Sequence, residues 1–101
     1  MILIKPGVKF HPDTFRYPEM SHIIYEAHIL APSGYELTIT SACDGKHKEN
    51  SKHYKGKAID FRIRDFPESV EVWARRLQNR LGDEYFILLE STHLHCQFNG
   101  G

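Results

Sequence analysis

Two short segments of the chain contain the residue types that can hold a metal ion. One includes His53 and ends at Asp60, and the other carries the pair His93 and His95. Imidazole nitrogens and carboxylate oxygens are zinc ligands, and a catalytic zinc site uses three of them and leaves a fourth position open. His53, Asp60 and one histidine of the pair would supply such a site. Two imidazoles and a carboxylate also suit other divalent ions.

Asp60 belongs to a segment with the alternation of a strand. Between residues 57 and 64, one face would carry Ile59, Phe61 and Ile63, and the other Ala58, Asp60 and Arg62. Gly56 permits a tight approach into this strand. Taken alone, His53 also fits a surface histidine, and Asp60 fits a carboxylate bonded to a loop amide.

The histidine pair lies in a second segment with strand periodicity, from His93 to Phe98. His93 and His95 would share one face, while Leu94, Cys96 and Phe98 share the apolar face. Two imidazoles are therefore held side by side. We expect Cys96 to point into the core and to be inert, and Cys43 to be an ordinary loop thiol.

The remaining periodicities predict the elements that position these side chains. Helical spacing is found over Ser21 to Ala31, and again from Phe66-Pro67 to Leu81, with Gly82 ending the second helix. Alternation predicts strands at Tyr35 to Ser41, Lys57 to Arg64, Tyr85 to Leu89 and His93 to Phe98, with a long loop from Ala42 to Lys55. The order predicts an α+β domain with a small, mostly antiparallel sheet and two main helices.

Composition restricts the class of protein. The chain has 101 residues and 41% hydrophobic residues, which predicts one domain over residues 1–101. Thirteen basic and thirteen acidic residues leave a formal net charge of zero, so we expect neither a nucleic acid nor a membrane as partner. The start, from Met1 to Pro6, lacks the features of a signal peptide. Cys43 and Cys96 indicate no disulfide framework.

The two site segments together resemble a family of zinc metallopeptidases. The pattern S-x-H-x-x-G-x-A-x-D, followed downstream by H-x-H, is similar to that of the family of D-Ala-D-Ala carboxypeptidases, murein endopeptidases and phage endolysins. The amino-terminal signalling domain of hedgehog proteins shares that fold, and residues 51–60 and 90–96 resemble it closely. The resemblance extends from Tyr35 to Phe98.

The resemblance implies a role for each site residue. It makes His53, Asp60 and His95 the zinc ligands and places His93 beside the metal as a hydrogen-bonding catalytic group. Either Glu90 or His93 would then act as the general base. A second alignment pairs Glu90 with His93 as E-x-x-H and demotes His95. We prefer His95 because the H-x-H alignment also matches the following Cys96 and the strand pattern. The alternative is that Glu90 is a solvated carboxylate in a turn and has no catalytic role.

The chain departs from these peptidases in one place. Many of them carry an arginine in the loop before the first ligand, where it can hold a substrate carboxylate, but residues 40–46 contain none. Lys46, Lys48 or Lys52 could meet an anion only as a point charge. This departure puts strict carboxypeptidase specificity in doubt and leaves zinc binding untouched.

The resemblance implies an enzyme that hydrolyses peptide bonds in peptidoglycan stem peptides with Zn²⁺ as its cofactor. A zinc-stabilised, hedgehog-like binding domain without turnover is the alternative, and a metal-free domain with solvent-facing histidines is a third reading. Glu90 favours the enzyme, whereas the missing arginine favours the binding domain. Without a signal peptide, we expect either a phage product that acts on the cell wall or a bacterial cytoplasmic enzyme that acts on recycled peptides.

Overall fold

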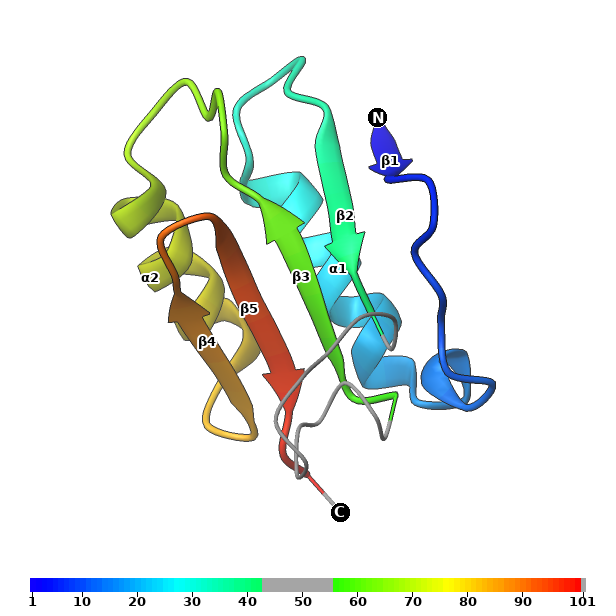
Figure 1. Ribbon diagram of the computed structural model, residues 1–101. Helices are drawn as coiled ribbons and strands as arrows, with labels where there is room; N and C mark the ends of the chain where they lie inside the picture. Colours follow the sequence, from blue (N-terminus) through cyan, green and yellow to red (C-terminus); the bar gives the residue numbers. More distant parts are fainter. Residues whose placement is uncertain (43–55, 101) are drawn as a thin grey trace.

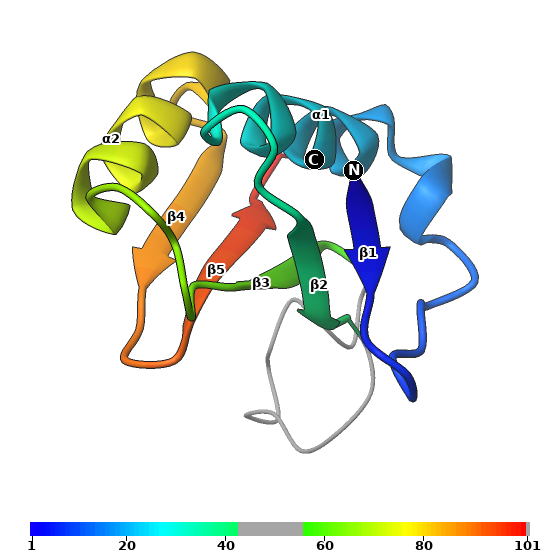
Figure 2. The same cartoon turned by 90° about the horizontal axis from the view of Figure 1, so that it is seen from above.

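The computed structural model describes residues 1–42 and 56–100, which form one sheet with two α-helices against one of its faces (Figure 1). Seen from above, both helices lie on the same side of the strands (Figure 2). The elements in chain order are β1 (Ile2–Ile4), the 3-10 helix η1 (Thr14–Arg16), α1 (Pro18–Leu30), β2 (Leu37–Ser41), β3 (Ala58–Arg62), α2 (Val70–Leu81), β4 (Tyr85–Leu89) and β5 (His93–Phe98). Among the described helices, none has the length and apolar character needed to cross a membrane.

The sheet has the strand order β1-β2-β3-β5-β4. The pairs β2–β3, β3–β5 and β5–β4 are antiparallel, and β1 runs parallel to β2. The predicted α+β class, with a mostly antiparallel sheet and two main helices, is therefore confirmed. The strand β1 and the short helix η1 were not predicted.

Helix α2 follows its sequence signals closely, with one correction at its start. Its buried stripe contains Trp73, Leu77 and Leu81, as predicted, and it ends at Gly82, which has a φ of 95°. The prediction that proline opens the helix was wrong. The side chain of Ser69 caps the helix by accepting a hydrogen bond from the Val72 amide at 3.3 Å, so the helix begins after Ser69.

Helix α1 begins at Pro18, three residues before the predicted start, because proline is well suited to the first turn of a helix. Its buried face contacts α2 through a hydrogen bond of 3.1 Å from the Trp73 indole nitrogen to the Ala27 carbonyl. A two-pronged ion pair between Glu26 and Arg80 joins the same two helices, with N–O distances of 2.9 and 3.1 Å. The two helices are thus held against each other as well as against the sheet.

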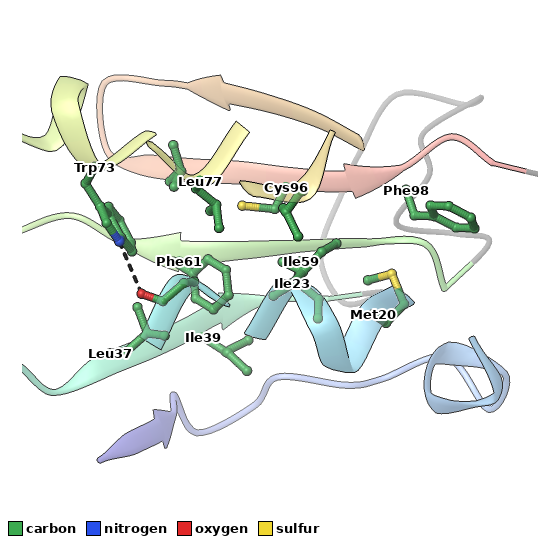
Figure 3. Packing of buried hydrophobic residues seen from close by; sticks show 13 residues of the cluster. Met20, Ile23, Leu37, Ile39, Ile59, Phe61, Trp73, Leu77, Cys96 and Phe98 are labelled. Atoms are coloured by element: carbon green, nitrogen blue, oxygen red, sulfur yellow. Dashed lines mark hydrogen bonds between the residues drawn. The ribbon is translucent and has the colours of Figure 1, made fainter. Parts of the chain in front are cut away.

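The hydrophobic core fills the space between the helices and the sheet (Figure 3). Its strand members alternate along β2, β3 and β5, so the covered face of the sheet is apolar. The members are Met20, Ile23, Ala27, Leu37, Ile39, Ile59, Phe61, Trp73, Leu77, Leu81, Leu94, Cys96 and Phe98.

Strand β3 differs from its predicted form because both of its faces are buried. Ile59 and Phe61 are fully buried on the helix side, and Ala58 and Asp60 are also buried on the opposite side. The strand lies in the middle of the sheet, between β2 and β5, so neighbours flank it on both edges. Asp60 is only 5% exposed, so it is a buried carboxylate, and a buried charge requires partners.

The chain enters β3 through a close approach that only glycine allows. Gly56 has a φ of 74°, and a Cβ there would lie 3.0 Å from both the Cβ of His11 and the hydroxyl of Thr14. The predicted role of Gly56 as a tight entry into the strand is confirmed.

Candidate metal centre

Asp60 and His95 meet on the face of the sheet that points away from the helices. They are direct partners in the antiparallel ladder between β3 and β5. The core residues Ile59, Phe61, Leu94 and Cys96 occupy the alternate positions, so the side chains of Asp60 and His95 project to the other side. The His95 Nδ1 lies 3.0 Å from the Asp60 Oδ1. Their side chains are only 15% and 8% exposed.

His93 joins this pair from the same strand as His95. Its Nε2 lies 3.7 Å from the Asp60 Oδ2, while its Nδ1 lies 3.0 Å from the Thr92 hydroxyl. The two imidazoles therefore approach different oxygens of one carboxylate. The His93 side chain is 31% exposed, so it is the more accessible of the two rings. The predicted side-by-side placement of the histidines is confirmed.

Gln97 fixes the orientation of the His95 ring, a role that the sequence analysis missed. The His95 Nε2 lies 2.6 Å from the Gln97 Oε1, and the Gln97 amide nitrogen donates to the Asn99 Oδ1 at 2.7 Å. Because an amide oxygen only accepts hydrogen bonds, the His95 Nε2 must carry the proton. The His95 Nδ1 faces the Asp60 Oδ1, which also accepts hydrogen bonds, so in the metal-free protein an Nδ1–H donates to Asp60. Loss of that proton would leave the Nδ1 lone pair available to a metal. The alternation of residues 95, 97 and 99 was the only sequence signal for this chain of contacts.

The electrostatic surroundings of His95 favour positive charge. Burial works to lower its pKa, but hydrogen bonds to Asp60 and Gln97 and the charges of Asp60 and Glu90 act in the opposite direction. The net effect raises the pKa of His95 above its ordinary value of 6.5. A site that stabilises an imidazolium also stabilises a bound cation, because both place positive charge beside the Asp60 carboxylate.

The spacing of these donors matches the dimensions of a zinc site. Ligands about 2.0 to 2.1 Å from a tetrahedral zinc lie roughly 3.3 to 3.4 Å from each other. The separation of 3.0 Å between the Asp60 Oδ1 and the His95 Nδ1 is close to this value. The donor set of carboxylate and imidazole therefore fits zinc.

The described residues do not complete a metal site on their own. Within residues 1–42 and 56–100, no group of three or more His, Cys, Asp or Glu side chains is arranged to hold a metal ion. The predicted third ligand, His53, lies outside the described residues, as do Cys43, Lys46, Lys48 and Lys52. The structure thus brings together Asp60, His95 and His93.

Glu90 lies at the exposed turn between β4 and β5, beside the histidine pair. Its backbone amide donates to the His93 carbonyl at 2.9 Å, which closes the hairpin. Its charge helps to raise the pKa of His95, so the carboxylate acts on the site electrostatically. Cys96 is fully buried on the core side, where burial raises the pKa of its thiol well above the ordinary value. The prediction that Cys96 points into the core is confirmed, and its thiol is kept protonated there.

Two arginines and a lysine lie close to the candidate ligands, and the sequence analysis did not assign them to the site. A cleft of about 450 Å³ is lined by Asp60, His93, Lys5, Thr40, Ser41, Arg62, Arg64 and Thr92. Arg62 is the ladder partner of His93. The spacing Asp60-x-Arg62-x-Arg64 on one side of a strand was the signal that could have identified them.

Comparison with known proteins finds a distant similarity to hedgehog proteins. Over 65 residues, which are 62% of this chain, it is 32% identical to the Tiggy-winkle hedgehog protein of Danio rerio and 31% identical to the Indian hedgehog protein of Gallus gallus. The Sonic hedgehog protein of Danio rerio is 32% identical over the same length. The aligned segment covers 16% of the length of each of these proteins. No family model and no solved structure matches the chain.

Proposed function

We propose that this protein is a zinc-dependent metallopeptidase that hydrolyses peptide bonds in peptidoglycan stem peptides. The observation that carries the proposal is the cluster of Asp60, His93 and His95, in which two imidazoles face one buried carboxylate at 3.0 and 3.7 Å. The cluster borders a cleft large enough for a short peptide segment. The two motifs described from the sequence supply the third ligand and the reaction class.

In this proposal, Asp60, His95 and His53 hold the metal. Zinc, when bound, supplies a water of lowered pKa and polarises the scissile carbonyl. Gln97 keeps the His95 Nδ1 directed at the site by accepting the proton of its Nε2. Without that contact, the ring could rotate or change tautomer.

In this proposal, Glu90 transfers the proton and His93 stabilises the negative charge that develops during the reaction. The Glu90 carboxylate takes the proton from the attacking water and passes it to the leaving amine. The His93 Nε2, which is partly exposed at the cleft, donates a hydrogen bond to the negative charge that develops on the scissile carbonyl oxygen. The Thr92 hydroxyl, at 3.0 Å from the His93 Nδ1, holds that ring in place.

The test combines metal analysis with an activity assay. We expect about one zinc per chain in the purified protein, loss of zinc in the variant His95→Ala, and retention of zinc in His93→Ala. Digested peptidoglycan should be cut only by the wild-type protein. His22→Ala, an exposed histidine on α1, is the matched control and should keep both zinc and activity. Absence of metal from the wild-type protein would refute the proposal.

A second candidate function is a zinc-stabilised binding domain without turnover. The similarity to hedgehog proteins over 65 residues favours it. It makes the same prediction for metal content but a different one for hydrolysis. Zinc bound through His95, without cleavage of any muropeptide, would select this function over the peptidase.

A further inference from the structure

Strand β4 lies at one edge of the sheet, and its sequence lacks the usual features that keep an edge strand from pairing with another chain. It is the last strand in the order β1-β2-β3-β5-β4 (Figure 1). Residues 85–89 read Tyr-Phe-Ile-Leu-Leu, without a charged side chain or a proline. Charges and proline are the common means by which proteins prevent further pairing at such an edge. This edge strand has neither.

The backbone groups of alternate residues in β4 point to this outer edge. At the hairpin, the Glu90 amide donates to the His93 carbonyl at 2.9 Å, so the backbone groups of Glu90 face β5. The direction of these groups alternates along an antiparallel strand. Counting back from Glu90, the amides and carbonyls of Leu89, Ile87 and Tyr85 therefore point away from β5.

The side chain of Gln78, from helix α2, occupies part of this edge. Its Oε1 accepts a hydrogen bond from the Ile87 amide at 3.0 Å, and its Nε2 donates to the Tyr85 carbonyl at 2.8 Å. The Nε2 also donates to the Gly82 carbonyl at 3.1 Å, just after the end of α2. The bonds to Ile87 and Tyr85 flank Phe86, as the backbone groups of a residue in a parallel neighbouring strand would do. The Gln78 carboxamide therefore takes the place of one residue of an additional strand.

The other side chains of β4 are apolar and exposed. Phe86 and Leu88 are 42% and 41% exposed, and they lie on the face of the sheet that points away from the helices. If β4 of a second copy paired antiparallel with β4 about a two-fold axis at Ile87, Phe86 of each copy would lie opposite Leu88 of the other. Apolar cross-strand pairs of this kind stabilise a sheet. The strand is therefore complementary to itself.

The two ends of β4 also carry complementary charge. The groove beside Leu89 is lined by Arg75 and by Glu71, which accepts a hydrogen bond from the Ser69 hydroxyl at 3.0 Å. The described lining of the hollow beside Tyr85 has three carboxylates and no cation: Glu19, Asp83 and Glu84. Antiparallel pairing brings the Tyr85 end of one copy to the Leu89 end of the other, so each Arg75 would face an acidic hollow.

Two features oppose this pairing in the wild-type chain. Gln78 already occupies the Ile87 amide and the Tyr85 carbonyl, which a second strand would need. The same register would place Glu84 opposite Glu90 of the other copy, and like charges opposite each other destabilise a pair of strands. The hydrogen bonds of Gln78 are lost when a second copy pairs, so they compete directly with it.

We propose that the outer edge of β4 is a pairing surface for β4 of a second copy of this chain, and that the side chain of Gln78 keeps this surface closed. The two copies would join through backbone hydrogen bonds between identical strands, with Phe86 and Leu88 covering each other across the two-fold axis. This inference goes beyond the proposed function and depends neither on metal binding nor on catalysis.

The first test compares the oligomeric state of variants by sedimentation equilibrium. The wild type should be monomeric where Gln78→Ala forms dimers, with a dimer dissociation constant at least about tenfold lower than that of the wild type. Gln78→Met, which keeps the length of this half-buried side chain without its amide, should behave as Gln78→Ala does. Asn79→Ala, at the next and exposed position of α2, is the matched control and should stay monomeric. Gln78 variants that are folded by circular dichroism and remain as monomeric as the wild type would overturn the proposal.

Further substitutions in the Gln78→Ala background test the register. Leu88→Lys, which places a charge opposite Phe86 of the other copy, should abolish the dimer. Glu84→Lys, which replaces repulsion by attraction to Glu90 of the other copy, should strengthen it several-fold. A dimer that survives Leu88→Lys would place the interface elsewhere, and a dimer weakened by Glu84→Lys would overturn the two-fold register.

Amide hydrogen exchange locates the surface. In the wild type, the Ile87 amide should be protected by Gln78 at every protein concentration. In Gln78→Ala, it should exchange at least about tenfold faster in dilute solution, and its protection should return as the dimer forms. A synthetic peptide of residues 84–90 should restore the same protection, and a scrambled peptide should not. Equal protection by both peptides would assign the edge to any extended chain and overturn the assignment to a second copy.

Discussion

The two faces of the same strands follow different physical rules. On the face toward the helices, Phe61 and Leu94 are fully buried in an apolar core. On the opposite face, their neighbours Asp60 and His95 form a polar cluster whose members depend on one another. The core is stabilised by apolar area removed from water, which is not directional. The polar cluster is held by directional hydrogen bonds, so its energy depends on the positions of individual atoms and not on the buried area.

The hydrogen-bonded chain on the polar face shows how far this dependence extends. It runs from Asp60 through His95 and Gln97 to Asn99, along the surface of the central strands. A buried polar network is favourable only when its members are satisfied. We therefore expect substitutions on the core face to change stability and substitutions on the polar face to change ligand binding.

The largest expected effect is on the core face. Phe61→Ala removes a fully buried ring that packs near Trp73, at 6.4 Å between ring centroids. We expect the free energy of unfolding to fall by about 3 to 5 kcal/mol, because the cavity adds to the lost burial. Urea unfolding followed by far-UV circular dichroism measures it. Phe86→Ala, at a ring that is 42% exposed on β4, is the control and should cost less than about 1 kcal/mol.

A substitution of Asp60, the residue next to Phe61, should change zinc affinity and leave the metal-free protein folded. Asp60→Asn keeps the size of the side chain but removes the charge that faces both imidazoles. We expect zinc affinity to fall by more than about 100-fold while the metal-free protein stays folded, since a ligand matters more than its supporting contacts. Competition with a chelating dye measures the affinity. Unchanged zinc binding would remove Asp60 from the ligand set.

A smaller effect on zinc affinity is expected for Gln97, which contacts the ligand His95. Gln97→Ala leaves the His95 Nε2 without its acceptor, so the ring loses its fixed tautomer. We expect zinc affinity to fall by about 10-fold, in the range typical for contacts that orient a metal ligand. Nitrogen-15 NMR of the His95 ring should show mixed tautomers in the variant. Gln97→Glu keeps an acceptor at the same place and should restore the single tautomer.

The smallest expected effect is a pH-dependent change in the free energy of unfolding, caused by the ion pair between the two helices. The Arg80 hydrogen bonds lower the pKa of Glu26 below its ordinary value of 4.5, although burial opposes them. The ion pair therefore stabilises the fold above pH 4.5, and this stabilisation is lost as the pH falls through the lowered pKa of folded Glu26. We expect Glu26→Gln to cost about 1 kcal/mol at pH 7, because Arg80 is largely exposed, and nothing at low pH.

Urea unfolding of wild type and Glu26→Gln at pH 7 and at pH 3 compares the two conditions. The difference between the proteins should shrink on acidification. A constant difference at both pH values would show that the side-chain shape, and not the charge of Glu26, accounts for the effect. Glu68→Gln, at an exposed position before α2, is the matched control.

The sequence predicted the parts of the fold that carry their own periodicity. The strands at 85–89 and 93–98 were predicted with the observed bounds, and α2 was predicted apart from its first turn. Strand β1 was missed because three residues carry no readable alternation and pair with β2 only once that edge exists. The burial of Ala58 and Asp60, on the face of β3 that points away from the helices, is not reported by local alternation.

In the candidate site, too, some features could be predicted from the sequence and others could not. The placement of His93 and His95 on one face and of Cys96 in the core followed from alternation. The contacts of Gln97 and the grouping of Arg62 with Lys5 did not, because they join side chains across strands or from distant segments. The predicted ligand His53 lies outside the described residues, so its role stays a prediction.

By itself, the sequence determined which side of each strand is apolar, where α2 ends, and which residues could bind a metal. These properties are local, because they depend on residue type and on periods of two or about 3.6 residues. Only the tertiary structure decided that Asp60 is buried opposite His95, that Gln97 contacts the His95 Nε2, and that two arginines share a cleft with Asp60. The order and register of the strands create these contacts, and both result from the packing of the whole chain.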